Sequence, residues 1–352
     1  MLNEFEIDSG NYIIWIKRYN ITMVAFIKFF VQRFLMFILV ILAVIGCQDN
    51  QSVRILKLAH VLDINHPVHK GMVYMAEKVS KTSNGKMRVD IYPGGQLGAE
   101  RDLIELLQIG SLAMTKVSTA SLEAFVPEMK IFGIPYLFRD DDHRWRVLNG
   151  DIGKKLLLAG DKYFLRGMCY YDAGSRSFYT KDKPINSPVD LKGLKIRVIK
   201  SITSVEMVQS LGGSATPIPW GELYTALQQG VVDGAENNPP SFYLSRHYEV
   251  CKYYSLDEHT SVPDILLMST VVWNSLSAQE QEWLQSAIDQ SVEFQKMLWK
   301  ESSEEALREV QKAEVEIIFP VKKPFQESVK DMYEFYRGTV IYDLITEIES
   351  VQ

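Results

Sequence analysis

The stretch from Asp190 to Tyr243 reads DLKGLKIRVIKSITSVEMVQSLGGSATPIPWGELYTALQQGVVDGAENNPPSFY and decides the fold. Alternating apolar residues at 196–198 predict a strand, helical spacing over 204–211 predicts a helix, and a pair of glycines then ends that helix. After a second strand, a helix over 221–229 leads into a third strand at 231–232. The order strand, helix, strand, helix, strand indicates an α/β fold.

Arg197 lies within the first of these strands, and Glu236, Asn237 and Asn238 follow the third. Open α/β sheets bind ligands at the ends of their strands. A guanidinium on a rigid strand presents a planar set of donors that matches a carboxylate bidentately. The alternative is an Arg on a solvated strand face, which spacing alone favours because most charged side chains are exposed.

Length and composition allow two lobes with ordinary cores. The chain has 352 residues, of which 47% are hydrophobic and 23% charged, a balance typical of globular proteins and not of disordered ones. The net charge of -6 argues against a nucleic-acid-binding protein, which requires a basic surface. A mild negative charge is explained by solubility.

The sequence predicts no metal site and no cofactor. Cys47, Cys169 and Cys251 form no CxxC motif, and the last two are either a disulfide or two buried thiols, with strand-like neighbours favouring thiols. His66 and His69 lie three residues apart but have no third ligand nearby. They are interpreted as a helix cap and a surface residue, or as cleft lining, in preference to metal ligands.

Residues 1–46 are predicted to be an export signal, with Met23 as an alternative start. Two basic residues precede the apolar run FLMFILVILAVI, which suits the core of a signal peptide and is short for a membrane span. The run ends in Val-Ile-Gly-Cys, which resembles a bacterial lipoprotein signal and implies that Cys47 is lipidated. Residues 47–53 would then be a tether. Ordinary cleavage and an uncleaved anchor are the alternatives.

Further elements follow from periodicity and from caps. Ser277 and Glu280 form a capping box before a helix that is predicted to run to about Lys312. A final amphipathic helix is predicted over 325–348. Earlier strands are predicted at 55–60, 86–92, 114–118 and 163–171, with helices at 68–79 and 99–109. Lys116 is unusual because it interrupts an otherwise apolar strand.

Five segments between about Leu56 and Glu316 together resemble the solute-binding proteins of tripartite ATP-independent periplasmic (TRAP) transporters, the extracytoplasmic solute receptors of family 7. They are AHVLDINHPVHKGM, YPGGQLGAERDLIELLQIGSLAMTKVSTASLEAFVPE, IPYLFRD, GSRSFYTKDKPINSPVDLKGLKIRV and ELYTALQQGVVDGAENNP. The resemblance implies a two-lobed α/β periplasmic binding protein-like fold with hinge strands and a long helix across both lobes. Lobe I would comprise 54–174 plus 263–302, and lobe II 175–262 plus 303–352.

The resemblance also implies roles for single residues. Arg197 would bind the ligand carboxylate bidentately, Arg176 would add a second cationic donor, and Asn237 would donate to the carboxylate or to a neighbouring hydroxyl. Trp220 would pack on the ligand ring. Glu100, Ser118 and His66 would contact hydroxyls or the ring oxygen. Four of these residues have a simpler interpretation: Arg176 as the partner of an acidic neighbour such as Asp172, and Trp220 as a core residue. Glu100 could be a carboxylate that is favoured in the first turn of its helix, and Ser118 a hydroxyl that caps the helix after it.

The ligand implied by STASLEAF, YYDAGSRSFYTK and ENNPPSFYLSRHYEVC is a uronic acid, D-glucuronate or D-galacturonate. Sialic-acid members of the family carry Glu and Arg where this chain has Ser118 and Ser121, so sialic acid is not expected. A C4-dicarboxylate or another organic acid is the alternative ligand. The implied partners are a small and a large TRAP membrane subunit, and the implied location is the periplasm, with a lipid anchor to a membrane.

Two other classes of protein share some of these features. A hydrolase or lyase acting on sugar acids could use Glu100 and Glu236 as acids, but no GxSxG, HExxH, GxGxxG or P-loop motif is present. The sequence therefore predicts a protein that is not an enzyme. A sugar-acid-sensing lipoprotein that partners a receptor would share every residue named above.

Overall fold

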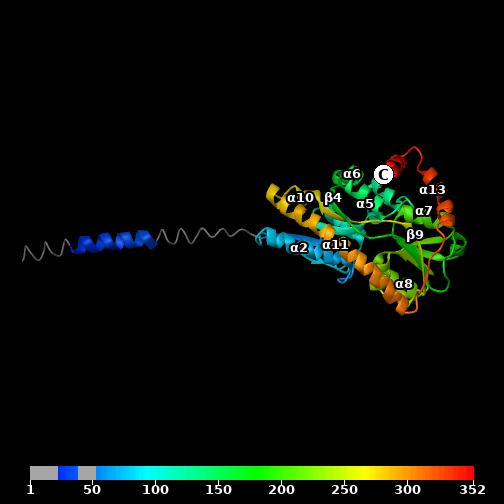
Figure 1. Cartoon of the computed structure of the whole chain (residues 1–352). Helices are drawn as coiled ribbons and strands as arrows, with labels where there is room; N and C mark the ends of the chain where they lie inside the picture. Colours follow the sequence, from blue (N-terminus) through cyan, green and yellow to red (C-terminus); the bar gives the residue numbers. More distant parts are fainter. Residues whose placement is uncertain (1–22, 39–52) are drawn as a thin grey trace, which may run out of the picture. The chain divides into compact units, whose positions relative to one another are not determined.

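The computed structural model describes residues 23–38 and 53–352, which belong to two separate units, Met1–Ser52 and Val53–Gln352 (Figure 1). In the first unit the described part is a helix over residues 23–38 with exposed side chains. Among the described helices, none combines the length and apolar character that crossing a bilayer requires. Cys47 and the predicted cleavage site lie outside the described residues.

One sheet, which we call the sheet of lobe I, has five strands in the order β2-β1-β3-β10-β4. β1 pairs in parallel with β2 and β3, whereas β10 runs antiparallel to β3 and β4. The chain therefore returns to this sheet through β10 after most of the second sheet has formed. The strands are β1 (Arg54–Ala59), β2 (Met87–Tyr92), β3 (Met114–Ser118), β4 (Leu165–Tyr171) and β10 (Asp264–Ser269), and α2 (Pro67–Thr82) and α3 (Glu100–Gln108) connect the first three.

The second sheet, that of lobe II, has the order β11-β9-β5-β8-β6-β7. Its parallel part confirms the α/β order predicted for 190–243, because β6, α7, β7, α8 and β8 follow one another there. The strands are β5 (Arg176–Thr180), β6 (Lys195–Val198), β7 (Ser214–Pro217), β8 (Gly234–Asn237), β9 (Tyr253–Thr260) and β11 (Glu316–Ile318), and the helices are α7 (Ile202–Ser210) and α8 (Leu223–Gln228).

The third predicted strand of that stretch is displaced along the chain. Residues 231–232 do not form a strand, and β8 begins only at Gly234, so that Glu236 and Asn237 lie inside it. β8 needs a residue without a Cβ at Gly234, because a Cβ there would lie 2.3 Å from the carbonyl oxygen of Tyr179 on β5. Glu236 and Asn237, which the sequence placed after a strand, are therefore part of a buried strand.

The longest helix in the part of the chain that the structure describes is α11 (Ala278–Lys312), with 35 residues (Figure 1). It packs against α2 and β4 of lobe I and against α9 (Pro239–Leu244) of lobe II. The predicted capping box is confirmed, since Ser277 Oγ accepts from the backbone N–H of Glu280 and the Glu280 side chain accepts from that of Ser277. The two-lobed fold and its long helix are therefore as predicted.

The prediction of a single helix over 325–348 is wrong. The structure divides it into α12 (Lys323–Ser328), α13 (Lys330–Phe335) and α14 (Val340–Ser350). Val329 leaves the helical conformation at φ -98° and ψ 2°, and Gly338 has a positive φ of 77°. The amphipathic spacing is real, but the three helices pack against different elements: α12 against β9 and η3 (Pro188–Leu191), α13 against α7, and α14 against η1 (Pro127–Gly133).

Helix α14 lies against η1 (Pro127–Gly133), in the segment between β3 and β4. His143, which follows η1 in the same segment, adds a second contact to α14, because its Nε2 atom bonds the carbonyl oxygen of Ile348 at 3.0 Å. The prediction assigns that segment to lobe I but 303–352 to lobe II, so α14 crosses between the two. The lobe boundaries themselves stay a prediction.

The remaining short helices lie between these elements, and both described cysteines are buried thiols. Cys169 is on β4 and Cys251 precedes β9, and neither forms a disulfide, as their neighbours predicted. The short helices are α4 (Thr119–Leu122), α5 (Asp141–Asn149), α6 (Asp151–Leu158), α10 (Thr270–Trp273), η2 (Asp161–Tyr163), η3 (Pro188–Leu191), η4 (Trp220–Glu222) and η5 (His247–Glu249).

A buried carboxylate, Glu123, links the end of α4 to the start of α7 in the other lobe. One oxygen accepts from the backbone N–H groups of Ile202 and Thr203, and the other accepts from Thr203 Oγ1 at 2.6 Å. Burial raises the pKa of Glu123, while these hydrogen bonds oppose that rise. Glu123 therefore satisfies the N-terminal amides of α7, as a capping residue does, from a distant part of the sequence.

We expect Glu123→Ala to lower the free energy of unfolding by about 1–3 kcal/mol, because two amides and a hydroxyl lose a buried acceptor. Urea denaturation of the purified protein measures this change. Glu105→Gln is the matched control, since it removes a carboxylate whose partner, Arg101, is exposed. That change is expected to cost at most a few tenths of a kcal/mol. Equal effects of the two substitutions would contradict the role given to Glu123.

Candidate ligand-binding site

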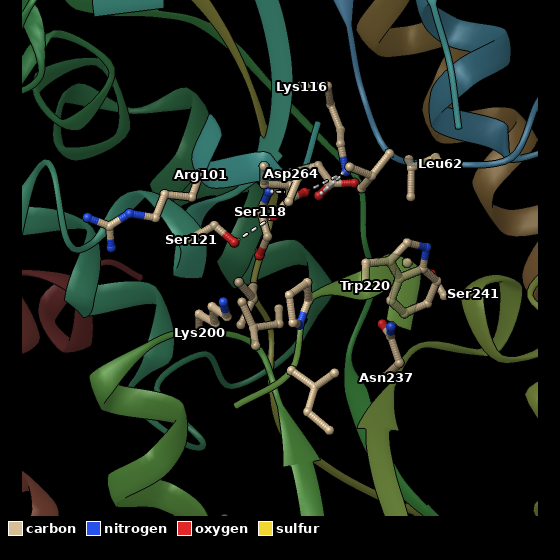
Figure 2. Close-up of a pocket in the computed structure, with 18 of the residues that line it drawn as sticks. Leu62, Arg101, Lys116, Ser118, Ser121, Lys200, Trp220, Asn237, Ser241 and Asp264 are labelled. Atoms are coloured by element: carbon tan, nitrogen blue, oxygen red, sulfur yellow. Dashed lines mark hydrogen bonds and ion pairs between the residues drawn. The ribbon is translucent and has the colours of Figure 1, made fainter. Parts of the chain in front are cut away.

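A cavity of about 330 Å³ lies between the lobes. In Figure 2, Lys116, Asp264, Ser118 and Ser121 lie in one half of the view, and Lys200, Trp220 and Asn237 in the other. The first group comes from the sheet of lobe I and from α4, and the second from lobe II. The cavity is within the range usual for small-molecule sites. Its central polar and aromatic residues are Glu100, Lys116, Ser118, Ser121 and Asp264 of lobe I and Arg176, Arg197, Trp220, Asn237 and Ser241 of lobe II.

Arg197 is the most unusual of these residues because its guanidinium is buried without an acidic partner. The residue is 2% exposed, and Nε donates to the carbonyl oxygen of Ile218 at 2.8 Å. Within residues 53–352, the buried Nη1 atom has no hydrogen-bond partner. Burial lowers the pKa of Arg197 to about 10, which still leaves it a cation at neutral pH. The solvated strand face considered from the sequence is thus ruled out.

Trp220 lies beside this guanidinium, with the ring centre 5.7 Å from the central carbon of Arg197. It occupies η4, directly after the two prolyl residues that end β7 and its loop. The side chain is half-buried, so part of the ring faces the cavity. A wall of this kind suits the C–H face of a ring-shaped ligand.

Arg176, the second predicted cation, already has partners within the protein. Its Nε atom donates to Glu236 Oε2, Nη2 donates to Glu236 Oε1 at 2.9 Å, and Nη1 donates to Asn237 Oδ1 at 2.9 Å. Its acidic partner is not Asp172, because that carboxylate pairs with Arg144 at 2.8 Å. Arg176 lines the cavity, but its charge is balanced there.

The Arg176–Glu236 pair contacts two more buried charged residues, His259 and, through it, Asp257. His259 Nδ1 lies 2.8 Å from Asp257 Oδ2, and its Nε2 lies 3.6 Å from Glu236 Oε2. Burial alone would raise the pKa of Glu236, but Arg176 and His259 hold it at about 2. Burial would lower the pKa of His259, but Asp257 and Glu236 raise it to about 9. The four groups therefore alternate in sign and sum to no net charge.

The wall of lobe I is built around Lys116, which is 2% exposed. Its Nζ atom lies 3.0 Å from Asp264 Oδ1 and 3.6 Å from Glu100 Oε1. Glu100 also accepts from the Ser118 backbone N–H at 3.1 Å and from Ser121 Oγ at 2.5 Å. These bonds explain why a Lys occurs inside an apolar strand, since two carboxylates share its charge.

The predicted site residues do not all reach the cavity. Arg176, Arg197, Trp220, Asn237, Glu100 and Ser118 line it, whereas His66 is not among its lining residues. His66 caps α2 instead, because its Nδ1 accepts from the Val68 backbone N–H, and its Nε2 bonds Ser241 Oγ at 3.3 Å. Among the described residues, no group of three or more potential ligands could hold a metal ion.

Sequence reasoning missed Asp264 and Ser241 and gave Lys116 no role. A signal was present for two of them, because Lys116 interrupts an apolar strand and Asp264 is a charged residue between Pro263 and the apolar run ILLM. Their proximity could not be inferred, since β10 pairs with β3 across nearly 150 residues of sequence.

The family profile described as bacterial extracellular solute-binding protein, family 7, matches residues 58–339. The chain belongs to this family. It is therefore a TRAP-type solute-binding protein, and the fold expected from the resemblance is confirmed.

Solved structures of other family 7 proteins are similar over most of their length. A TRAP periplasmic solute-binding protein from Bradyrhizobium sp. BTAi1, in complex with D-galacturonate, is 40% identical with a TM-score of 0.82 over 84% of this chain and 99% of that chain. One from Pseudomonas putida F1, with bound D-glucuronate, is 35% identical with a TM-score of 0.82 over 85% and 97%. The uncharacterized protein YiiZ of Salmonella typhimurium is 38% identical over 85% of this chain and 92% of its own length.

The raised pKa of His259 predicts a dependence of stability on pH. The folded pKa of about 9 lies above the ordinary value of 6.5, so the stabilisation is complete below pH 6.5 and is lost as pH rises through 9. Between these values the free energy of unfolding should fall by up to about 1.4 kcal/mol per pH unit. Thermal or urea unfolding from pH 6 to pH 10 measures this slope. In His259→Gln the slope should be reduced, and identical profiles for the two proteins would refute the role of His259.

Proposed function

We propose that this chain captures a uronic acid, D-galacturonate or D-glucuronate, by its carboxylate, and delivers it to the small and large membrane subunits of a TRAP transporter. The observation that carries the proposal is the buried guanidinium of Arg197, which faces a cavity between the lobes without an acidic partner in the described part of the chain. The uronates bound by relatives of the same fold support the choice of ligand.

A ligand carboxylate would supply the charge that Arg197 lacks. An uncompensated buried cation is costly, and an anion that enters the cavity removes that cost. Nη1 and the second terminal nitrogen of the guanidinium form a planar pair of donors that fits a carboxylate bidentately. Because burial excludes water, the attraction is stronger than it would be at the surface.

Asn237 would act as the second donor to the ligand. Its Oδ1 atom accepts from Arg176 Nη1 and from the Asn238 backbone N–H, both at 2.9 Å. These two bonds orient the amide so that its NH2 group remains free to donate into the cavity. Arg176 is thus proposed to position Asn237, in place of the direct salt bridge to the ligand first considered. Trp220 would pack on the pyranose ring.

The same geometry supports a receptor over a sugar-acid hydrolase. A glycosidase acid needs a carboxyl group that is protonated near neutral pH. The pKa of Glu236 is held at about 2 by Arg176, and both oxygens of Glu100 accept hydrogen bonds from the protein. Incubation with uronides should therefore give binding at one ligand per chain and no product.

We expect Arg197→Ala to weaken uronate binding by at least about a hundredfold while the fold remains intact, since a charge-assisted bidentate contact is lost. Titration calorimetry with D-galacturonate and D-glucuronate measures the affinity, and circular dichroism checks the fold. Lys200→Ala is the matched control, because Lys200 also lines the cavity but is exposed. That variant should retain affinity within a few-fold.

Two results would overturn these assignments. Tight uronate binding by the Arg197→Ala variant would remove Arg197 from the site. Saturation of the wild-type protein by a C4-dicarboxylate such as succinate, with no response to either uronate, would replace the ligand class. Co-purification with TRAP membrane subunits separates a transport receptor from a sensor that partners a signalling receptor.

We also propose that the protein is held at a membrane in the periplasm by a lipid on Cys47. The support is the signal-like sequence before that residue together with membership of an extracytoplasmic family. Cys47→Ser should abolish incorporation of lipid into the protein, because the sulfur atom to which the lipid is attached is lost. Metabolic labelling with a fatty acid followed by immunoprecipitation measures this loss, and equal labelling of wild type and variant would contradict lipidation.

A further inference from the structure

The wall of the cavity opposite Arg197 carries more negative than positive charge. Asp264 and Glu100 share the single ammonium of Lys116, whose Nζ atom is nearer to Asp264, at 3.0 Å, than to Glu100, at 3.6 Å. All three side chains line the cavity. The wall of lobe I thus bears two carboxylates and one cation, whereas Arg197 on the other wall is an unbalanced cation.

The atoms of this wall differ in their freedom to meet a ligand. Both oxygens of Glu100 accept from Ser118 and Ser121, which fixes that carboxylate in place. One oxygen of Asp264 accepts from Lys116, and in residues 53–352 the other has no hydrogen-bond partner. Lys116 has three N–H donors and only these two acidic neighbours. A free acceptor and a free donor therefore lie side by side.

We propose that Asp264, Glu100 and Lys116 form a filter that accepts ligand hydroxyl groups and rejects a second ligand carboxylate. This inference rests on the proposed function, because it concerns the end of the acid that lies away from Arg197. The unpartnered Nη1 of Arg197 is the independent sign that an anionic group belongs at the opposite wall. The filter makes the site specific for monocarboxylic sugar acids.

The chemistry of the two groups explains the selection. A hydroxyl can donate to Asp264 and accept from Lys116 at the same time, so both free atoms are satisfied. A carboxylate is an acceptor only, and it would meet two carboxylates for one ammonium. Like charges brought together in a buried site are strongly unfavourable, and such contacts exclude wrong ligands. Asp264 is 8% exposed, so water cannot screen this repulsion well.

The experiment compares three acids that share the galacto configuration. D-Galacturonate is a monocarboxylate, galactarate has a second carboxylate at the C1 end, and L-galactonate, which has a hydroxymethyl group at that end, is an open-chain acid with the same configuration relative to its single carboxylate. Calorimetry on the wild-type protein should show a preference for galacturonate over galactarate of at least about a hundredfold. In Asp264→Asn that preference should shrink by at least about tenfold, with no corresponding gain for galactonate.

Glu100→Gln provides a second variant in case Asp264→Asn does not fold. It should also reduce the preference for galacturonate over galactarate. The control is Glu105→Gln, which removes the same charge from an exposed position on α3 outside the lining of the cavity. Its preference should stay within about twofold of wild type. Equal affinity of the wild type for galacturonate and galactarate overturns the filter, as does an unchanged ratio in both test variants that still bind galacturonate. Failure of the wild type to bind any uronate would overturn the proposed function instead.

Discussion

The proposed binding site depends on a cation that is buried without an acidic partner in the part of the chain that the structure describes. Arg197 comes from the middle of β6, where a charged side chain ordinarily faces solvent, and it is held by a bond to the Ile218 carbonyl and by Trp220 at 5.7 Å. A buried guanidinium without an acidic partner costs stability. Such a cost is retained where it improves binding, since an anion then gains an attraction that water would have weakened.

The charged residues near Arg197 pair with one another and therefore do not neutralise its guanidinium. Arg176 is a second arginine in the lining of the cavity, but Glu236 neutralises it, and His259 and Asp257 continue the alternation of charge. If Glu236 were free it could pair with Arg197 and close the site. Its two bonds to Arg176 prevent this. These four groups therefore balance one another, whereas Arg197 is the cation that the proposed function assigns to the ligand carboxylate.

The sequence was sufficient for the elements with strong local signals. The capping box at Ser277 and Glu280, the helix it begins and the alternation in β6 all depend on neighbours in sequence, and they were predicted correctly. The break of the last helix at Val329 and the late start of β8 were missed, because tertiary contacts override local spacing there. The residues of the site differ in the same respect. Arg197 lies within a sequence motif and could be proposed from it, whereas Asp264 reaches Lys116 only through the pairing of β10 with β3.

The two thiols described with the fold make residues 53–352 convenient for labelling. Cys169 and Cys251 are buried, and burial raises the pKa of both, to about 12 for Cys251, so neither forms the reactive thiolate at neutral pH. Maleimide dyes or spin labels would consequently ignore them. One introduced surface cysteine on each lobe would then report the separation of the lobes by energy transfer or by electron resonance, with the native thiols left in place.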